Sequence, residues 1–318
     1  MTTAVRWMEH RQIWLYLAAT AVGVIGGIAA PQSASVLAAS INPVLGLLLF
    51  ATFLGVPLSR IGRAFRDVRF LAAILALNFV AVPIVVFGLS RFVSADLALL
   101  IGVVLVLSTP CIDYVIVFAG IAGGAKDRLL AAAPLLMLVQ ILLLPAYLLL
   151  FAGAAAISSI EILPFVEAFV FLIALPLAAA ALVQWVAARS KVGVRIEKVT
   201  QTAMVPLMMA TLAVVIGSQI SAVGERLGKL LLVVPIYVAF LAVMLVVGIA
   251  TARVARLDVA ASRALVFSGA TRNSLVVLPL ALALPASLDL APLAVVTQTL
   301  IELMGMLTFV KLVPRLVR

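Results

Sequence analysis

Two long apolar stretches of this 318-residue chain are interrupted near their middles by residues that could do chemistry. The first stretch, 97–123, contains residues 108–113 (STPCID), with a proline, the only cysteine and a carboxylate. The second, 259–284, contains residues 271–273 (TRN). Apolar stretches of this length predict membrane-spanning helices. Polar or ionisable residues at their mid-depth indicate a transport site.

The proline in the first stretch predicts a broken helix. Pro110 lacks an N–H and clashes with the preceding turn, so the helix should end near Thr109. Thr109 would cap the second half-helix, with Pro110 at its first position. Cys111 would lie in the first turn, where the helix dipole favours a thiolate, a soft ligand for thiophilic elements. A buried cysteine can equally act as a small apolar side chain.

Arg272 is the least expected residue, because an arginine at the bilayer centre costs roughly 3 kcal/mol or more unless it is paired or hydrated. It could clamp an anion, partner a protonatable carboxylate, or form a structural salt bridge with Asp113 or Glu302. Thr109, Cys111 and Asn273 are further candidate substrate ligands.

Several further polar residues lie within apolar stretches. Glu302 lies four residues after Gln298 and shares its helix face, so the pair is a candidate for proton or ion coupling, as is Asp113. Asn78 is a candidate substrate ligand and Gln140 a candidate coupling residue. Helix–helix hydrogen bonds explain these two amides equally well.

Composition excludes most other classes. The chain is 66% hydrophobic and 11% charged, with a mean hydropathy of +1.34. This indicates a polytopic membrane protein. Its net charge of +10 comes largely from short loops, so nucleic acid is not the expected partner. One cysteine excludes an internal disulfide, and the single histidine, His10, provides no histidine metal site. We expect no cofactor and no bound metal. Cys111 is a possible transient ligand for arsenic.

Ten apolar stretches are long enough to span a bilayer. They are 13–30, 42–58, 69–90, 97–123, 128–152, 163–188, 203–219, 229–252, 259–284 and 290–313. The first resembles a signal peptide, but the many later spans favour a retained helix. Loops of one side carry most of the Lys and Arg; the other side has only Arg91, Arg226 and Lys229. The positive-inside rule predicts an inner or plasma membrane protein with both termini cytoplasmic.

A constant offset of 162 residues relates glycine and polar positions of the two halves. The matching pairs are Gly55/Gly217, Ser59/Ser221, Gly62/Gly224, Arg91/Arg253, Asp96/Asp258, Thr109/Thr271 and Asp127/Asp289. Cys111 falls on Asn273 and Gln140 on Glu302. We therefore expect two inverted five-helix repeats, 1–160 and 161–318, whose broken helices 4 and 9 face one another at the midplane.

Residues 107–114 (LSTPCIDY) and 269–279 (GATRNSLVVLP) resemble the bile acid:sodium symporter superfamily, most closely its arsenic-resistance or arsenite-efflux permeases. The resemblance implies ten helices, with a panel domain of helices 1, 2, 6 and 7. Helices 3–5 and 8–10 would form a core domain in which helices 4 and 9 cross. It also implies functional roles for Cys111 and Glu302.

Two departures from the family bear on cargo and coupling. Pro110 stands where arsenite permeases carry an arginine, so another arsenical or an oxyanion is an alternative cargo. Span 5 reads AAAPLLMLVQ and lacks the Ser/Thr pattern that sodium symporters use. Few hard oxygen ligands and a nearby arginine disfavour bound sodium.

We therefore expect a secondary transporter whose first candidate activity is proton-coupled efflux of arsenite or a related arsenical or oxyanion. The second is sodium- or proton-coupled uptake of an organic anion, with Arg272 holding a carboxylate. An intramembrane enzyme is a weak third candidate, because the sequence contains no His-Glu-x-x-His or aspartate-rich diphosphate motif and no serine–histidine pair.

Overall fold

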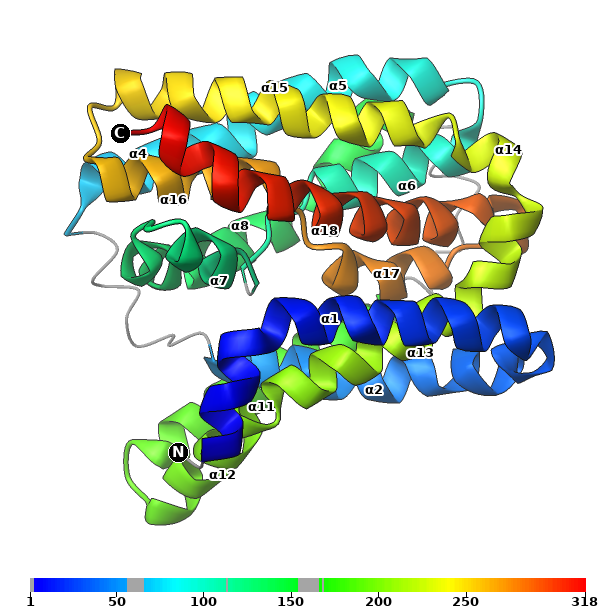
Figure 1. The fold of residues 1–318 in the computed structure, drawn as a ribbon, viewed down its shortest axis with the longest axis horizontal. Helices are drawn as coiled ribbons and strands as arrows, with labels where there is room; N and C mark the ends of the chain where they lie inside the picture. The colour runs from blue at the N-terminus through cyan, green and yellow to red at the C-terminus, as the bar shows by residue number, and fades with distance from the viewer. Residues whose placement is uncertain (1–2, 56–65, 113, 154–165, 168) are drawn as a thin grey trace. The chain divides into compact units, whose positions relative to one another are not determined.

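The computed structural model describes residues 3–55, 66–112, 114–153, 166–167 and 169–318, and their regular structure is helical apart from one isolated β-bridge (Figure 1). In this part of the chain seven helices are long and apolar enough to cross a membrane. Three shorter apolar helices cover Trp14–Ala29, Leu97–Leu107 and Val259–Ala270. The predicted all-α, multi-pass membrane class is confirmed; the number of ten crossings stays a prediction.

The chain divides into two compact units, each built from two separate segments. Unit 1 comprises Met1–Val56 and Ile162–Leu227, and unit 2 comprises Pro57–Glu161 and Gly228–Arg318. The helices of unit 1 are α1 (Thr3–Ala29), η1 (Pro31–Ser33), α2 (Ala34–Gly55), η5 (Val170–Ala174), α11 (Leu175–Ala187), α12 (Lys191–Thr202) and α13 (Met204–Glu225).

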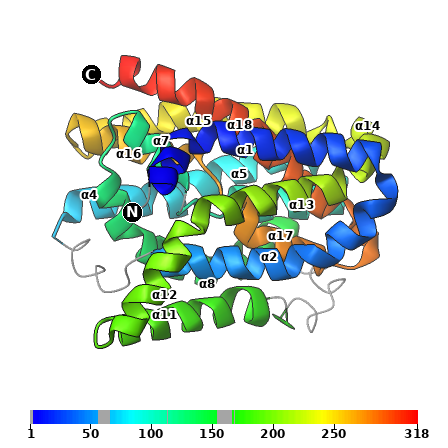
Figure 2. The same ribbon diagram turned by 60° about the horizontal axis from the view of Figure 1, so that its bottom comes forward.

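Within unit 1, α13 packs between α1 and α2 (Figure 2). Small residues allow the backbones of α1 and α13 to approach closely. A Cβ added to Gly27 would clash with the carbonyl oxygen of Gly217. The Ser221 hydroxyl donates to Gly27 O at 3.1 Å. Small residues and hydroxyl groups of this kind are the usual means of joining helices in a bilayer.

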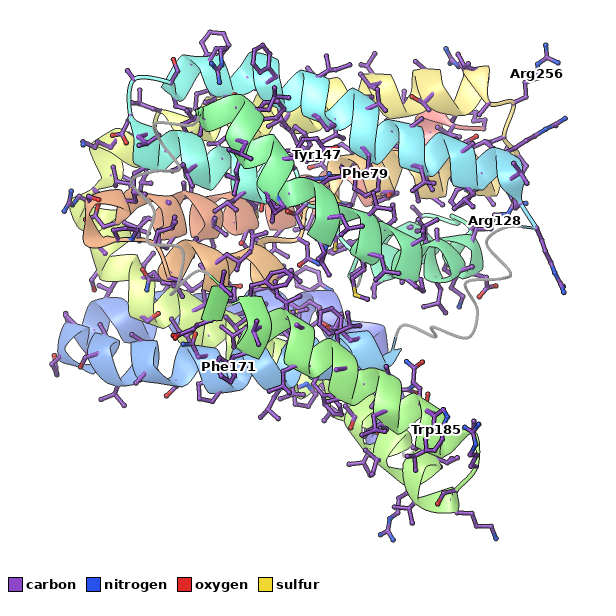
Figure 3. All side chains as sticks on the ribbon, turned by 180° about the vertical axis from the view of Figure 1, so that it is seen from behind. Phe79, Arg128, Tyr147, Phe171, Trp185 and Arg256 are labelled. Carbon is purple, nitrogen blue, oxygen red and sulfur yellow. The ribbon has the colours of Figure 1, made fainter. Side chains whose placement is uncertain are left out.

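The outer face of unit 1 carries large apolar side chains. Phe171 and Trp185 project outward from η5 and α11 (Figure 3). The Arg189 guanidinium carbon lies 4.2 Å from the centroid of the Trp185 ring. A paired aromatic and basic side chain at a helix end is typical of a membrane–water interface, which agrees with the membrane assignment.

Unit 2 contains the two interrupted helices. Its helices are α4 (Val68–Ala76), η3 (Leu77–Ala81), α5 (Val82–Ser90), η4 (Arg91–Val93), α6 (Leu97–Leu107), α7 (Tyr114–Ile121), α8 (Lys126–Ala152), α15 (Val233–Val254), α16 (Val259–Ala270), α17 (Ser274–Leu282), η6 (Ala286–Leu288) and α18 (Leu290–Leu316). The short α14 (Leu227–Leu230) lies at the boundary of the units.

The core of unit 2 is formed by its short apolar helices. Every residue of α6 from Ala98 to Leu107 is buried, and α16 and α17 are almost as completely buried. Helices that are apolar on all sides belong in an interior. The short α5 and the longer α8, α15 and α18 pack against them, and α18 runs alongside α16 and α17 (Figure 1). The Tyr147 hydroxyl of α8 donates to Phe79 O at 2.9 Å (Figure 3).

Ion pairs at the ends of unit 2 join loops that the sequence places on the same side of the membrane. Arg128 contacts Asp67 at 3.2 Å and Asp258 at 2.7 Å, which joins the starts of α4, α8 and α16. Lys229 contacts Asp96 at 3.4 Å, at the start of α6. The grouping agrees with the charge pattern, while the cytoplasmic orientation stays a prediction.

Candidate functional site

The first interruption separates α6 from α7. Helix α6 ends at Leu107, and the Thr109 hydroxyl donates back to Leu105 O at 2.8 Å. Residues 110–112 are not helical, and α7 begins only at Tyr114. Two separate helices, α6 and α7, therefore occupy the apolar stretch 97–123. The expected detail of the break is wrong: Thr109 bonds to the preceding helix, and neither Pro110 nor Cys111 lies in the following one.

The second interruption separates α16 from α17. Thr271 ends α16 in an extended conformation, and its hydroxyl donates to Phe267 O at 2.8 Å. Asn273 caps α17, because its Oδ1 accepts a hydrogen bond from the Val276 N–H at 3.2 Å. A side-chain cap satisfies one of the unpaired N–H groups of a new helix start.

The two interruptions pair with each other through their backbones. Pro110 and Arg272 face one another in an isolated antiparallel bridge. The N–H of Cys111 donates to Thr271 O at 3.4 Å, and the N–H of Asn273 donates to Thr109 O at 2.8 Å. Irregular backbone inside a membrane needs such internal partners. The pairing occupies the backbone of Pro110 and Cys111, which are not helical.

The bridge brings together four of the predicted substrate-site residues, all of them buried. They are Thr109, Cys111, Arg272 and Asn273. Asp113, the predicted coupling residue beside them, lies outside the described residues.

The Arg272 guanidinium is fully buried and surrounded by oxygen acceptors. Its Nη2 donates to Asn78 Oδ1 at 2.8 Å, Ser268 O at 2.5 Å and Gly269 O at 2.9 Å. Its Nη1 donates to Leu107 O at 3.4 Å. The carbonyls belong to the C-terminal turns of α16 and α6, where helices leave carbonyls without internal partners. The guanidinium thus joins both half-helix ends, a contribution that charge patterns did not predict.

Asn78 also joins this cluster through hydrogen bonds between helices, and its role as a substrate ligand stays a prediction. It lies in the π-helical segment η3, and its Nδ2 donates to Ser268 Oγ and to Ile74 O, both at 3.0 Å. Single π-helical turns often occur at functional sites, because they redirect a side chain inward.

Glu302 and Gln298 approach the crossing from α18. Glu302 Oε2 accepts the backbone N–H of Arg272 at 2.8 Å and a hydrogen bond from Gln298 Nε2. Thr299, on the same helix, donates to Ser274 Oγ at 2.8 Å, which ties α18 to the start of α17. The carboxylate is therefore bound to the backbone of the second break itself.

Some buried polar atoms at the crossing have no hydrogen-bond partner among the described residues. They are Asn273 Nδ2, Gln298 Oε1 and Ser108 Oγ. Buried polar atoms are rarely left unpaired in native proteins. Such a donor and such acceptors are the groups that a small hydroxylated ligand would need.

Gln140 is buried in α8, but the structure does not bring it into the bonded cluster. Its Oε1 likewise accepts no hydrogen bond in the described part of the chain. Its role in coupling remains a prediction.

Sequence reasoning missed Ser268 and Phe240. The Phe240 ring centroid lies 5.6 Å from the Arg272 guanidinium carbon, on the side provided by α15. Phe240 stands 162 residues after Asn78, so the repeat offset already contained the signal. The comparison of the two halves considered only glycine and polar residues. It therefore missed this pair, in which an asparagine in the first half corresponds to a phenylalanine in the second.

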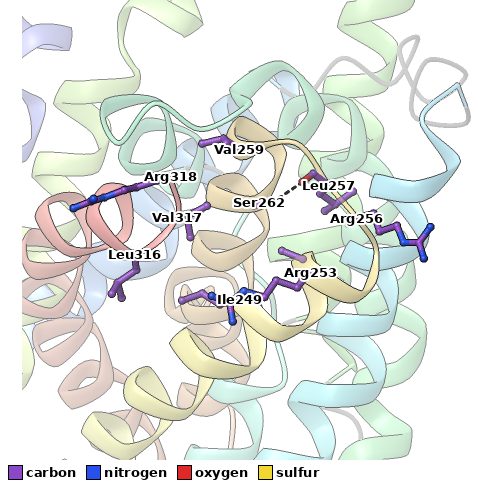
Figure 4. Close-up of a pocket in the computed structure, with 10 residues that line it drawn as sticks. Ile249, Arg253, Arg256, Leu257, Val259, Ser262, Leu316, Val317 and Arg318 are labelled. Carbon is purple, nitrogen blue, oxygen red and sulfur yellow. Dashed lines mark hydrogen bonds between the residues drawn. The ribbon is translucent and has the colours of Figure 1, made fainter.

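A surface cavity of about 310 Å³ lies elsewhere in unit 2, at the ends of α15, α16 and α18 (Figure 4). Arg253, Arg256 and Arg318 line it, and the Ser262 hydroxyl beside it donates to Leu257 O at 3.3 Å. None of the candidate site residues lines this cavity.

These features define a multi-pass membrane protein with two discontinuous helices paired inside one unit. Residues 42–230 match the model of the sodium bile acid symporter family, and the chain belongs to that family of transporters. The matched region includes Asn78 and the first break but ends before Arg272 and Glu302. No curated protein matches the sequence.

Proposed function

We propose that this chain is a secondary active transporter that expels arsenite, or a related arsenical or oxyanion, in exchange for protons. The cargo binds at the crossing of the two breaks. The ten spans form two inverted repeats, an architecture common among such transporters. The bridge between Pro110 and Arg272 supports the proposed repeats. These two residues are 162 positions apart, which is the offset that relates the two halves of the sequence.

The observation that carries the proposal is the chemistry gathered at the bridge. Cys111 provides a buried thiol, Asn273 Nδ2 provides a donor, and Gln298 Oε1 provides an acceptor. Arsenite is a small hydroxylated species with a thiophilic centre, so it matches both the soft ligand and the unpaired polar atoms. Exchange of one arsenic-bound hydroxyl for the Cys111 sulfur releases water and retains the oxidation state. One thiol allows the reverse step, which release requires.

Glu302 is the proposed proton carrier. As a carboxylate, it holds the Arg272 N–H through a charge-assisted hydrogen bond, which is about twice as strong as a neutral one. Protonation would weaken that bond and loosen α18 from the break. We therefore propose that proton binding to Glu302 and cargo binding at the crossing compete, because both depend on how α18 contacts the second break. Asp113 and Gln140 remain candidate contributors to the same step.

We also propose that the two compact units act as panel and core. Unit 1 contains spans 1, 2, 6 and 7, and unit 2 contains spans 3–5 and 8–10. Movement of the core would expose the crossing to each side of the membrane in turn, as in other inverted-repeat transporters.

The family match favours a second candidate, sodium- or proton-coupled transport of an organic anion. In that reading Arg272 would bind a carboxylate. The guanidinium already donates to three backbone carbonyls and to Asn78, so an anion would have to displace contacts that hold the half-helices together. We therefore rank this candidate second.

Replacement of Cys111 by serine tests the cargo. In an arsenite-sensitive strain, wild type should restore growth and Cys111→Ser should not, with equal amounts of both proteins in the membrane. Ser90→Ala is the matched control, because it changes a buried hydroxyl that donates only to Phe87 O, away from the crossing. Unchanged resistance in Cys111→Ser would remove the thiol from the mechanism.

Flux in everted vesicles tests the coupling. We expect an imposed pH gradient to drive arsenite movement without sodium, and Glu302→Gln to abolish that dependence on pH. Loss of a hydrogen bond to a charged group costs about 1.5–3 kcal/mol, which corresponds to roughly a 10- to 100-fold lower rate. A strict requirement for sodium would favour the organic-anion candidate instead.

A further inference from the structure

Four uncharged oxygen atoms that accept hydrogen bonds from the Arg272 guanidinium form a cage beside it. Three are backbone carbonyls of Leu107, Ser268 and Gly269, and the fourth is Asn78 Oδ1, at distances from 2.5 to 3.4 Å. The Phe240 ring lies on another side, 5.6 Å from the guanidinium carbon. All of these groups belong to unit 2, and the arginine is completely buried.

Such a cage has the composition of an alkali-cation site. Carbonyls at the C-terminal ends of half-helices carry the negative end of the helix dipole. In discontinuous-helix transporters, these ends and the unwound backbone beside them coordinate the coupling sodium. Here two such ends, those of α6 and α16, converge together with an amide oxygen. The position that should attract sodium is already filled by a cation on the chain.

We propose that Arg272 is a built-in cation that replaces sodium in this cage, so that no sodium binds there. The family to which the chain belongs is named for sodium symport, and these residues do not fit that ion at this position. The tethered guanidinium compensates the partial negative charge of the carbonyls. Because it is part of the chain and cannot cross the membrane, it cannot couple transport to an ion gradient. The inference deepens the proposed function by leaving ion coupling to groups such as Glu302. It also predicts that the cage becomes a sodium site when the guanidinium is removed.

The test measures sodium binding to the purified full-length protein in detergent, without arsenite. Thermal unfolding is followed in sodium, potassium or choline chloride at constant ionic strength. Wild type should show the same Tm in all three salts. Arg272→Ala should have a low Tm in potassium and choline, and sodium should raise it by about 5 °C with saturation. This outcome does not depend on the cargo, so it can fail while arsenite efflux is confirmed, or the reverse.

Three variants make the result specific. Arg272→Lys keeps a cation on the chain and should not respond to sodium. Adding Asn78→Leu to Arg272→Ala removes one cage oxygen and should weaken the sodium response. Arg263→Ala is the matched control: this arginine also donates to three carbonyls, those of Ala122, Pro314 and Val317, but is only half-buried. Water can solvate its carbonyls, so sodium should have no specific effect.

Two results would overturn the proposal. One is a sodium-specific rise in the Tm of wild type that Asn78→Leu removes, which would show sodium in the cage beside the arginine. The other is a folded Arg272→Ala protein with no response to sodium. If Arg272→Ala cannot be purified in a folded state in potassium chloride, recovery during purification in sodium and in potassium chloride becomes the measurement. Recovery in sodium alone supports the proposal, and failure in both salts contradicts it.

Discussion

At the break between α6 and α7 the bridge region contains Thr109, Pro110 and Cys111; at the break between α16 and α17 it contains residues 271–273 (TRN). The backbones behave alike. In each break a threonine hydroxyl donates to the carbonyl four residues earlier, at 2.8 Å in both cases. In each, the third residue donates its N–H to the threonine carbonyl of the other break.

The side chains of the two breaks differ in what they can do. Pro110 offers no polar side chain, whereas its partner Arg272 donates to both half-helix ends. Cys111 offers a sulfur, whereas its partner Asn273 caps a helix. The same backbone geometry is therefore compatible with a proposed division of roles, in which the second break holds the crossing together and the first provides the cargo ligand.

Removal of the guanidinium should have the largest effect on stability. Arg272→Ala leaves several buried carbonyls and Asn78 without their donor, and we expect the free energy of unfolding in potassium medium to fall by about 3–5 kcal/mol. Its bridge partner is the matched control. Pro110→Ala removes only backbone restriction and should cost about 1 kcal/mol or less. Denaturant unfolding in detergent measures both. Equal losses in the two variants would show that the second break has no special structural role.

Loss of the helix cap should have the next largest effect. Asn273→Ala removes the acceptor for the Val276 N–H and should cost about 1 kcal/mol of unfolding free energy. Asn273→Ser retains a capping oxygen and should restore most of it. At the equivalent position of the other break, Cys111→Ser should leave stability nearly unchanged while abolishing arsenite resistance. If Cys111→Ser also destabilises the protein by 1 kcal/mol or more, the proposed division of roles is wrong.

The sequence predicted where the two breaks lie, because proline and an isolated arginine within apolar stretches have local physical consequences. It also predicted that Glu302 and Gln298 share a helix face, since four residues separate them, and the two side chains are hydrogen-bonded within α18. The pairing of the breaks was expected from the 162-residue offset, and the reciprocal hydrogen bonds agree with it.

What could not be predicted was the partner of each polar group. An anion, a protonatable carboxylate and a salt bridge with Asp113 or Glu302 were all open as partners of Arg272. Its side chain donates to backbone carbonyls, and its backbone N–H donates to Glu302. Carbonyls are invisible in a sequence, because every residue has one and only the fold decides which are unpaired. For the same reason Thr109 was wrongly expected to cap the following helix. Its hydroxyl bonds to the preceding helix and its carbonyl accepts the Asn273 N–H of the bridge, so no helix starts there.

The paired threonines test the part of the comparison in which the breaks are alike. Thr109→Val and Thr271→Val each remove one hydroxyl and keep the branched shape. We expect each to lower the free energy of unfolding by about 0.5–1 kcal/mol, and by equal amounts within error. Chemical unfolding of the two single variants measures this. A loss in one variant more than twice that in the other would show that the two backbones are not equivalent.

The smallest expected effect concerns the aspartates that start the half-helices. Asp96 caps α6 and Asp258 caps α16, at positions related by the same offset. The pKa of Asp258 is lowered, first because its carboxylate accepts the Ala261 N–H and also because Arg128 lies beside it. The folded protein therefore binds this proton less readily than the unfolded chain. Its stabilising contribution is present above the ordinary carboxylate pKa and is lost as pH falls through the lowered value.

Asp258→Asn should therefore flatten the acid side of the stability profile, with the difference from wild type largest near neutral pH and vanishing below the folded pKa. Asp258 is well exposed, so salt should shrink the Arg128 part of the effect and leave the part due to the helix cap. Asp127→Asn is the control for loss of a surface carboxylate. Tm measured between pH 3 and 7 at low and high salt separates these contributions. A difference that persists unchanged at the acid end would mean that Asp258 stabilises α16 by some means other than its charge.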